Sequence, residues 1–119
     1  MQLTIPFHVT RCGDVSVIDV AAALEPSDKV TVESLQDLDE LIADEGPRKL
    51  LLDFNFMEWD ISPVMLHMID LADSLAHPGC LKLARVPVEA QNACKLLSLN
   101  GTHFSIYRST EDALNAFRD

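Results

Sequence analysis

KLLLDF, residues 49 to 54, is the stretch that decides the fold of this chain. Its apolar run is uninterrupted and has the length of one strand, which is typical of a strand covered on both faces. Such strands belong to parallel sheets in which helices connect one strand to the next. The stretch therefore predicts the central strand of an α/β sheet.

Helix and strand signals alternate on the C-terminal side of this strand. A helix is predicted from about 63 to 76, because Ser62 and Pro63 suit the N-cap and the first helical position. The following elements are a strand at 81 to 85, a helix with Pro87 in its first turn that closes near Asn100-Gly101, a strand at 104 to 107, and a terminal helix opened by Ser109.

Two strand-like segments and one helix precede the central strand. Partly alternating apolar residues at 3 to 9 and 15 to 20 predict a hairpin, and Pro6 confines its first strand to the sheet edge. Apolar residues at helical spacing predict an amphipathic helix from about 30 to 45. The order ββαβαβαβα predicts a single α/β domain over residues 1 to 119, with a mixed, mostly parallel five-stranded sheet and four helices.

The charge of the chain favours some classes of partner over others. The net charge is −10, and residues 1 to 60 hold thirteen acids against four bases. An acidic surface repels nucleic acid phosphates and anionic lipid, so direct binding to either is not expected, whereas a basic protein face is attracted. Acidity for solubility alone is an equally good interpretation.

The sequence shows none of the patterns that we would expect of an enzyme or of a membrane-spanning protein. No stretch approaches the roughly 18 unbroken apolar residues of a membrane span, and no signal-peptide pattern is seen, so a cytoplasmic location is expected. Cys12, Cys80 and Cys94 form no CxxC pair and are expected as reduced thiols. The histidines lack metal-ligand spacing and there is no Gly-rich phosphate loop, so we expect no metal, no cofactor and no enzyme activity.

Four segments in order resemble the STAS domain of bacterial anti-sigma factor antagonists, in register from about Val9 to Phe117. Ala22-Ala23-Leu24-Glu25 stands where the family often shows Gly-x-Leu-Asp, and Leu52-Asp53 matches the Leu-Asp pair of its central strand. The other two segments are FMEWDISPVML (56 to 66) and KLARVPVEAQNACKLLSLNGTHFSIYRSTEDAL (82 to 114). The resemblance implies a STAS-like fold and a regulatory role in signal transduction and transcription through protein binding.

The same resemblance implies a phosphorylation site at Ser62. In the family the strand-to-helix loop commonly reads Asp-Ser-Ser-Gly, and a partner kinase, itself the anti-sigma factor, phosphorylates the first serine. The corresponding residues here are Ile61-Ser62-Pro63-Val64, so the serine is present and its three neighbours differ. We expect phosphate on Ser62, next to Glu58 and Asp60, to repel an acidic partner surface.

A partner-binding surface is predicted around this loop and the helix that follows it. Met65, Leu66 and Ile69 lie beside the core-facing stripe of the helix and are partly to spare for docking. The alternative, that a tightly covered helix buries them and that Trp59 is a packing anchor, stays open. The predicted partner-binding residues are Glu25, Glu58, Trp59, Asp60, Ile61, Ser62, Met65, Leu66 and Ile69.

Two functions from different classes agree with the sequence. In the first, the chain binds an anti-sigma factor or another serine-kinase-type protein and is switched by phosphorylation of Ser62. In the second, it is a non-phosphorylated subunit of a lipid-transport or signalling assembly. The presence of Ser62 favours the first function, and the loss of the Asp and Gly around it favours the second. The sequence leaves homo-oligomerisation open.

Overall fold

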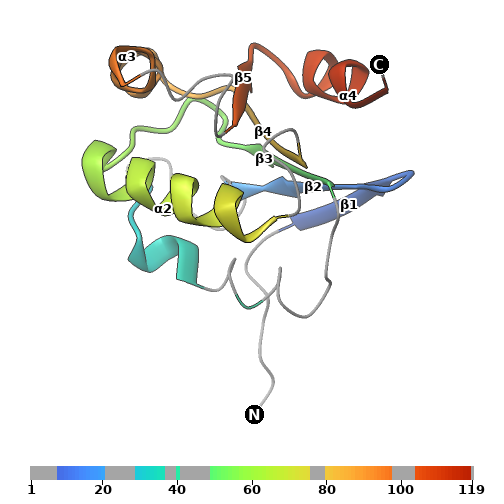
Figure 1. The fold of residues 1–119 in the computed structure, drawn as a ribbon, viewed down its shortest axis with the longest axis horizontal. Coiled ribbons are helices and arrows are strands. Elements are labelled where there is room, and N and C mark those ends of the chain that lie inside the picture. Colours follow the sequence, from blue (N-terminus) through green and yellow to red (C-terminus); the bar gives the residue numbers. More distant parts are fainter. Residues whose placement is uncertain are drawn as a thin grey trace.

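The computed structural model describes residues 8–20, 29–36, 40, 49–75, 80–97 and 104–118. These residues form a five-stranded sheet in which the spatial order of the strands, β1-β2-β3-β4-β5, is also their order along the chain (Figure 1). The predicted α/β class and mixed, mostly parallel sheet are confirmed. The elements are β1 (His8–Cys12), β2 (Val15–Asp19), the 3-10 helix η2 (Glu33–Leu35), β3 (Lys49–Asp53), α2 (Ile61–Ser74), β4 (Leu81–Ala84), α3 (Val88–Leu96), β5 (Ser105–Tyr107) and α4 (Thr110–Arg118).

The hairpin of β1 and β2 supplies the antiparallel pair of the sheet. Cys12 pairs with Val15, so Gly13 and Asp14 form a two-residue turn, and Gly13 has a φ of 64°. Positive φ at the first central position suits a type II′ turn, in which glycine is favoured. The pairs β2–β3, β3–β4 and β4–β5 are all parallel. The sheet is therefore parallel everywhere except at the β1 edge.

Alternation along β3 sends its side chains into two separate cores. Leu50 and Leu52 lie in the larger core with the buried residues of η2, α2 and α3, whereas Leu51 lies in a smaller core with Ala113 of α4. All three leucines are fully buried, as predicted for a strand covered on both faces. η2, α2 and α3 thus lie on the face of the larger core, and α4, which follows β5, covers the other face.

The predicted helix from 30 to 45 is wrong at its start. Val30 forms an isolated parallel bridge with Trp59, and the chain turns as the 3-10 helix η2 only at Glu33. Gln36 and Glu40 have helical backbone, while 37–39 and 41–48 lie outside the described residues. Within the described ranges there are thus three α-helices and a 3-10 helix, in place of the four helices predicted.

Smaller differences concern the ends of elements. Pro87 is the N-cap of α3 and so precedes the first helical turn, in which it was predicted. The predicted C-terminal stop of α3 at Asn100-Gly101 and the edge-strand residue Pro6 lie outside the described residues. The opening of α4 agrees with the sequence, because the Asp112 amide donates a hydrogen bond to Ser109 Oγ at 3.1 Å. No helix in the described part of the chain is long and apolar enough to cross a membrane.

Candidate functional site at the start of α2

The helix α2 begins two residues earlier than the sequence predicts. Asp60 is its N-cap, and the first helical hydrogen bond runs from the Val64 amide to the Asp60 carbonyl at 3.1 Å. Asp60 itself is not helical, with φ −76° and ψ 87°, and its amide donates to the Val30 carbonyl at 2.8 Å. The predicted places of Ser62 at the N-cap and of Pro63 at the first helical position are therefore wrong.

Ser62 is the second helical residue and Pro63 the third. The first N–H groups of an α-helix have no partner within the helix, so Pro63 still removes no helical hydrogen bond. The Ser62 side chain is exposed on this first turn. Ser62 thus lies where a modifying enzyme can reach it and where the positive end of the helix dipole favours added negative charge.

A partly buried ion pair fixes the end of β3, from which the loop to α2 leaves. Arg85, directly after β4, donates from its Nε to Asp53 Oδ1 at 2.8 Å and from a terminal nitrogen to Asp53 Oδ2. Its other terminal nitrogen donates to Asn55 Oδ1 at 2.9 Å. The hydrogen bond to Asp53 raises the pKa of Arg85 above its ordinary value, so this cation stays charged.

Backbone geometry at the same place is unusual. Asn55, Phe56 and Arg85 have positive φ angles of 48°, 59° and 54°. Such left-handed geometry is common for asparagine but rare for bulky residues. The Phe56 amide donates to the Arg85 carbonyl at 2.6 Å, while 56% of the Phe56 side chain is exposed. This hydrogen bond joins the segments that follow β3 and β4, and the Phe56 ring is left facing solvent.

Residue 30 holds the other end of the loop. The Val30 amide donates to the Glu58 carbonyl at 2.8 Å, and the Asp60 amide donates back to Val30. The intervening Trp59 is only 4% exposed and packs on Phe54, with ring centroids 4.9 Å apart. Trp59 thus packs in the core, as the alternative left open by the sequence expects. The loop is held at both ends before α2 starts.

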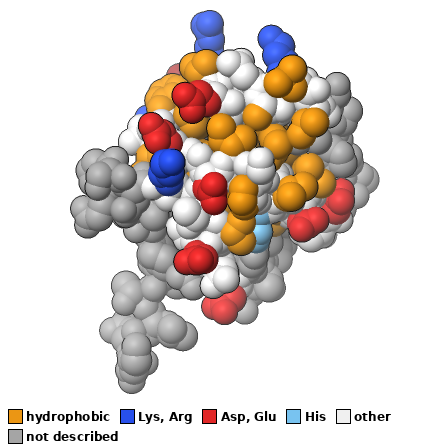
Figure 2. Space-filling model, turned by 90° about the vertical axis from the view of Figure 1, so that its left-hand side faces the viewer, with side chains coloured by type: hydrophobic (Ala, Val, Ile, Leu, Met, Phe, Trp, Pro, Cys, Tyr) orange, Lys and Arg blue, Asp and Glu red, His pale blue; other side chains and the backbone are white. Residues whose placement is uncertain are grey.

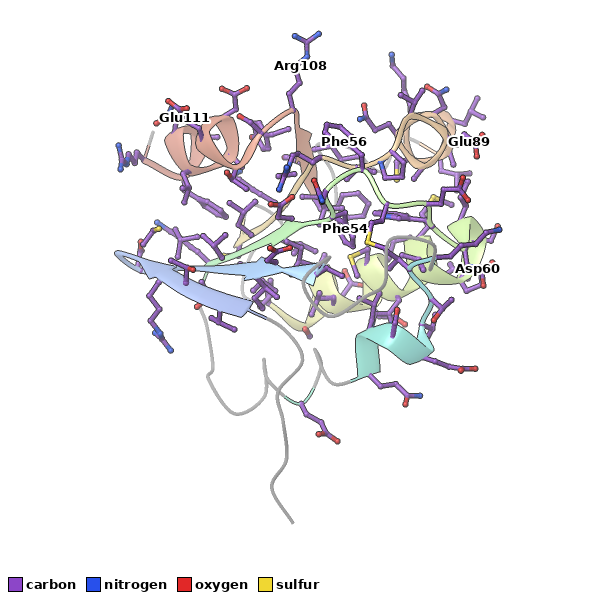
Figure 3. The ribbon with its side chains drawn as sticks, turned by 180° about the vertical axis from the view of Figure 1, so that it is seen from behind. Phe54, Phe56, Asp60, Glu89, Arg108 and Glu111 are labelled. Carbon is purple, nitrogen blue, oxygen red and sulfur yellow. The ribbon has the colours of Figure 1, made fainter. Side chains whose placement is uncertain are left out.

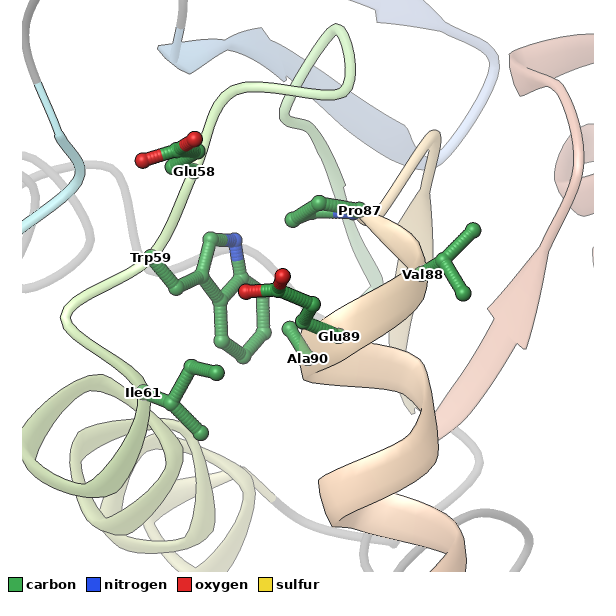
Figure 4. A pocket seen from close by; sticks show the side chains of 7 residues that line it. All are labelled: Glu58, Trp59, Ile61, Pro87, Val88, Glu89 and Ala90. Atoms are coloured by element: carbon green, nitrogen blue, oxygen red, sulfur yellow. The ribbon is translucent and has the colours of Figure 1, made fainter.

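The Trp59 ring also lines a pocket of about 190 Å³ between the loop and the start of α3 (Figure 4). Its Nε1 is buried and has no hydrogen-bond acceptor among the described residues. The pocket is lined by Glu58, Trp59, Ile61, Pro87, Val88, Glu89 and Ala90.

The other predicted partner-binding residues differ in exposure. Leu66 is 62% exposed, and Glu58, Asp60 and Ser62 are exposed as well. Met65 was predicted to be partly to spare, which is wrong, because its side chain is buried in the larger core. The side chains of Ile61 and Ile69 are half-buried against that core, and Glu25 lies outside the described residues.

Some exposed apolar residues of this end of the molecule were not predicted. Val88, Leu96 and Leu97 are 68%, 85% and 59% exposed, whereas the residues that α3 buries are Ala90 and Cys94. Small residues on its inner face let α3 lie close to the core, so its large apolar residues remain outside. Small residues on one side of the predicted helix and large apolar residues on the other were the sequence signal that could have predicted this exposure. Figure 2 shows apolar side chains gathered on the face where α2 begins and α3 lies, with acidic side chains beside them.

No group of three or more His, Cys, Asp or Glu side chains in the described ranges is placed to hold a metal ion. What the site offers is an exposed hydroxyl, exposed apolar side chains, and acidic groups on a loop fixed at both ends.

The sequence and the fold were both compared with those of known proteins. No protein-family profile matches the chain, and no curated protein sequence matches it. Among solved structures, a serine-to-glutamate variant of RsbS from Moorella thermoacetica is similar, with a TM-score of 0.58 and 15% sequence identity. The match covers 95% of this chain and 98% of RsbS, a STAS-domain anti-sigma factor antagonist. The STAS resemblance stated from the sequence is therefore confirmed for the fold: this chain has the fold of RsbS.

Proposed function

We propose that this protein is a regulatory binding domain of the anti-sigma factor antagonist type, and that phosphorylation of Ser62 by a partner kinase controls its binding. The observation that carries the proposal is the exposure of Ser62 on the first turn of α2, one helical turn before exposed Leu66. A switchable hydroxyl and an apolar contact residue thus share one helix face. The likeness of the fold to RsbS supports the same class of function.

The proposed switch acts through charge. A phosphoserine carries close to two negative charges at neutral pH, and at the start of a helix it is near free N–H groups. Exposed Glu58 and Asp60 already make this surface acidic. Phosphate on Ser62 adds to that charge without needing a change of fold, so it acts on the partner surface. We therefore propose release of the partner on phosphorylation.

The partner is proposed to be an anti-sigma factor or a related serine kinase, met in the cytoplasm. A second candidate is a subunit of a lipid-transport or signalling assembly that binds through the same face without phosphorylation. The neighbours of Ser62 favour this second candidate, since Pro63 follows the serine directly and Val64 is fully buried. Both candidates predict binding by the Leu66 face, and only the first predicts modification of Ser62.

The test combines kinase treatment with binding measurements. The folded chain is incubated with the candidate kinase and ATP, and mass spectrometry of the intact chain and its peptides locates any phosphate. Binding is then compared for wild type, Ser62→Ala, Ser62→Asp and Leu66→Ser. The control is Ser74→Asp, an exposed serine at the far end of the same helix.

Phosphate on Ser62, retained binding by Ser62→Ala and a loss of on the order of tenfold or more for Ser62→Asp support the switch. Leu66→Ser weakens binding under both candidates. If Ser62 stays unmodified and Ser62→Asp binds as well as Ser74→Asp and wild type, the switch is excluded and the constitutive subunit remains.

A further inference from the structure

We propose that the pocket beside Trp59 receives a basic segment of the partner, with one backbone carbonyl at the Trp59 indole N–H and a Lys or Arg side chain between Glu58 and Glu89. The pocket adjoins the Ser62 surface through Ile61. This inference rests on the proposed function, because it takes the ligand to be part of a protein partner. It adds the chemistry of the partner segment that binds.

Two sets of hydrogen-bond donors border the pocket. The first is Trp59 Nε1, which is buried and has no acceptor among the described residues. The second is the start of α3, where Pro87 provides no side-chain cap and the first helical hydrogen bond runs from Gln91 to the Pro87 carbonyl at 2.9 Å. The amides of 88 to 90 precede that bond and have no partner within the helix. Figure 4 shows the indole nitrogen on the side of the ring that faces Pro87.

The charges at the rim decide which acceptor fits. Of the residues that line the pocket, Glu58 and Glu89 are acidic and none is basic, and exposed Asp60 lies between the lining residues Trp59 and Ile61. A free anion would meet this like charge, whereas a peptide carbonyl accepts the same hydrogen bonds and carries none. A neighbouring cation is attracted by both carboxylates. The rim therefore selects a carbonyl that is accompanied by a basic side chain.

The size and walls of the pocket suit the same ligand. Its volume of about 190 Å³ is below the roughly 300 to 1,000 Å³ typical of pockets for small-molecule ligands. Ile61, Pro87 and Ala90 provide apolar walls, against which the methylene stem of Lys or Arg packs while its charged end stays at the rim. One side chain and its adjoining peptide group fill such a space, and a cofactor does not.

The test uses the fact that Trp59 is the single tryptophan of the chain. In the ¹⁵N-labelled protein its indole N–H gives one separate NMR signal. The probes are N-acetyl-arginine methylamide, N-acetyl-norleucine methylamide and sodium acetate, at equal ionic strength. We expect the arginine probe to move the indole signal and the amides of 88 to 90 in a saturable way. The norleucine probe binds more weakly, and acetate moves none of these signals.

Three variants separate the contributions. Trp59→Phe keeps an aromatic ring against Phe54 and removes the donor, so the amide shifts at 88 to 90 weaken. Glu58→Gln with Glu89→Gln lowers affinity for the arginine probe about three- to tenfold and leaves the norleucine probe unchanged. The matched control is Glu111→Gln on α4, at the opposite end of the molecule from Asp60 and Glu89 (Figure 3).

The inference is overturned if the arginine probe leaves the indole signal in place up to its solubility limit, or if acetate binds as well as the arginine probe. Equal affinity for the arginine and norleucine probes also overturns it, because the acidic rim would then select nothing. These titrations use no kinase and no Ser62 variant, so the switch can fail while the pocket binds its probe. Equally, phosphorylation of Ser62 can be demonstrated while the pocket fails.

Discussion

Arg85 forms an ion pair with Asp53 at the carboxyl ends of β4 and β3, and its Nε lies 2.8 Å from Asp53 Oδ1. The Asp53 side chain is 8% exposed and that of Arg85 is 35% exposed, so the pair lies at the boundary between core and solvent. The same guanidinium reaches Asn55, the second residue of the loop that leads to Ser62. The ion pair therefore connects the centre of the sheet to the start of the proposed binding surface.

Removing the charge of Asp53 tests the importance of this ion pair for stability. Asp53→Asn keeps the size of the side chain but weakens the hydrogen bonds from Arg85, and we expect a loss of about 2 kcal/mol in the free energy of unfolding. Urea denaturation gives this value. The control is Asp14→Asn, which breaks the exposed Asp14–Lys49 pair and should cost less than about 1 kcal/mol. Equal losses for the two variants would show that burial of Asp53 adds nothing.

The start of α2 gives a second prediction. Ser62 is not the N-cap, so Ser62→Ala should change the free energy of unfolding by less than about 0.5 kcal/mol. Asp60→Asn keeps a good N-cap residue and removes a charge from the helix start, which should cost about 0.3 to 1 kcal/mol. Both values come from urea denaturation at low ionic strength. A loss near 1 kcal/mol for Ser62→Ala alone would mean that Ser62 caps the helix after all.

At Phe56 we predict a substitution that raises stability, whereas the previous substitutions lower it or leave it unchanged. Its left-handed backbone costs roughly 1 to 2 kcal/mol for a residue with a Cβ, whereas glycine adopts it freely and loses more entropy on folding. With 56% of the ring exposed, Phe56→Gly should raise stability by about 0.5 kcal/mol. Leu66→Gly, at a similarly exposed helical position, should lower it by about 1 kcal/mol. Thermal unfolding of both variants checks the signs, and destabilisation by Phe56→Gly would show that its ring contacts matter more than backbone strain.

The thiols should differ in reactivity with pH. Burial raises the pKa of Cys94 to about 11, so this thiol stays protonated, and unreactive, through neutral and moderately alkaline pH. Cys12 is exposed. Iodoacetamide between pH 7 and 9 should therefore modify Cys12 first and leave Cys94 intact, as followed by mass spectrometry of peptides. All three cysteines should react in urea, and rapid modification of Cys94 in the native protein would contradict its burial.

The sequence predicted the sheet well because its signals are local. The continuous apolar run of β3 and the glycine turn before β2 are determined by residues close together in the chain. The cap of α2 was placed wrongly because Ile61 and Ser62 are already helical, and the cap is Asp60, whose amide donates to the carbonyl of Val30, a residue far from it in sequence. Ser-Pro is a good local start signal, but the chain is helical from Ile61, directly after the residues that contact Val30.

The candidate site was predictable only in part for the same reason. Exposed Ser62 and Leu66 followed from the loop and the helical period. The ion pair joins Asp53 to Arg85, which lie 32 positions apart in the sequence, so no local sequence pattern predicts it. The Trp59 pocket needs the start of α3 beside the loop, which only the packed fold provides. Met65 was misplaced because the width of the buried stripe of α2 depends on the packing of the larger core, in which Met65 is buried.

The strand order β1-β2-β3-β4-β5 also has a consequence for how the chain folds. Each strand pairs with its predecessor in the sequence, so no pairing has to wait for a distant segment, and contact order stays low for a parallel sheet. The sheet can grow unit by unit as the chain leaves the ribosome. The exception is the face of Val15, Leu51 and Ala84, which is covered by α4, a helix that emerges after all five strands. Until α4 docks, that face is open to chaperones and to aggregation.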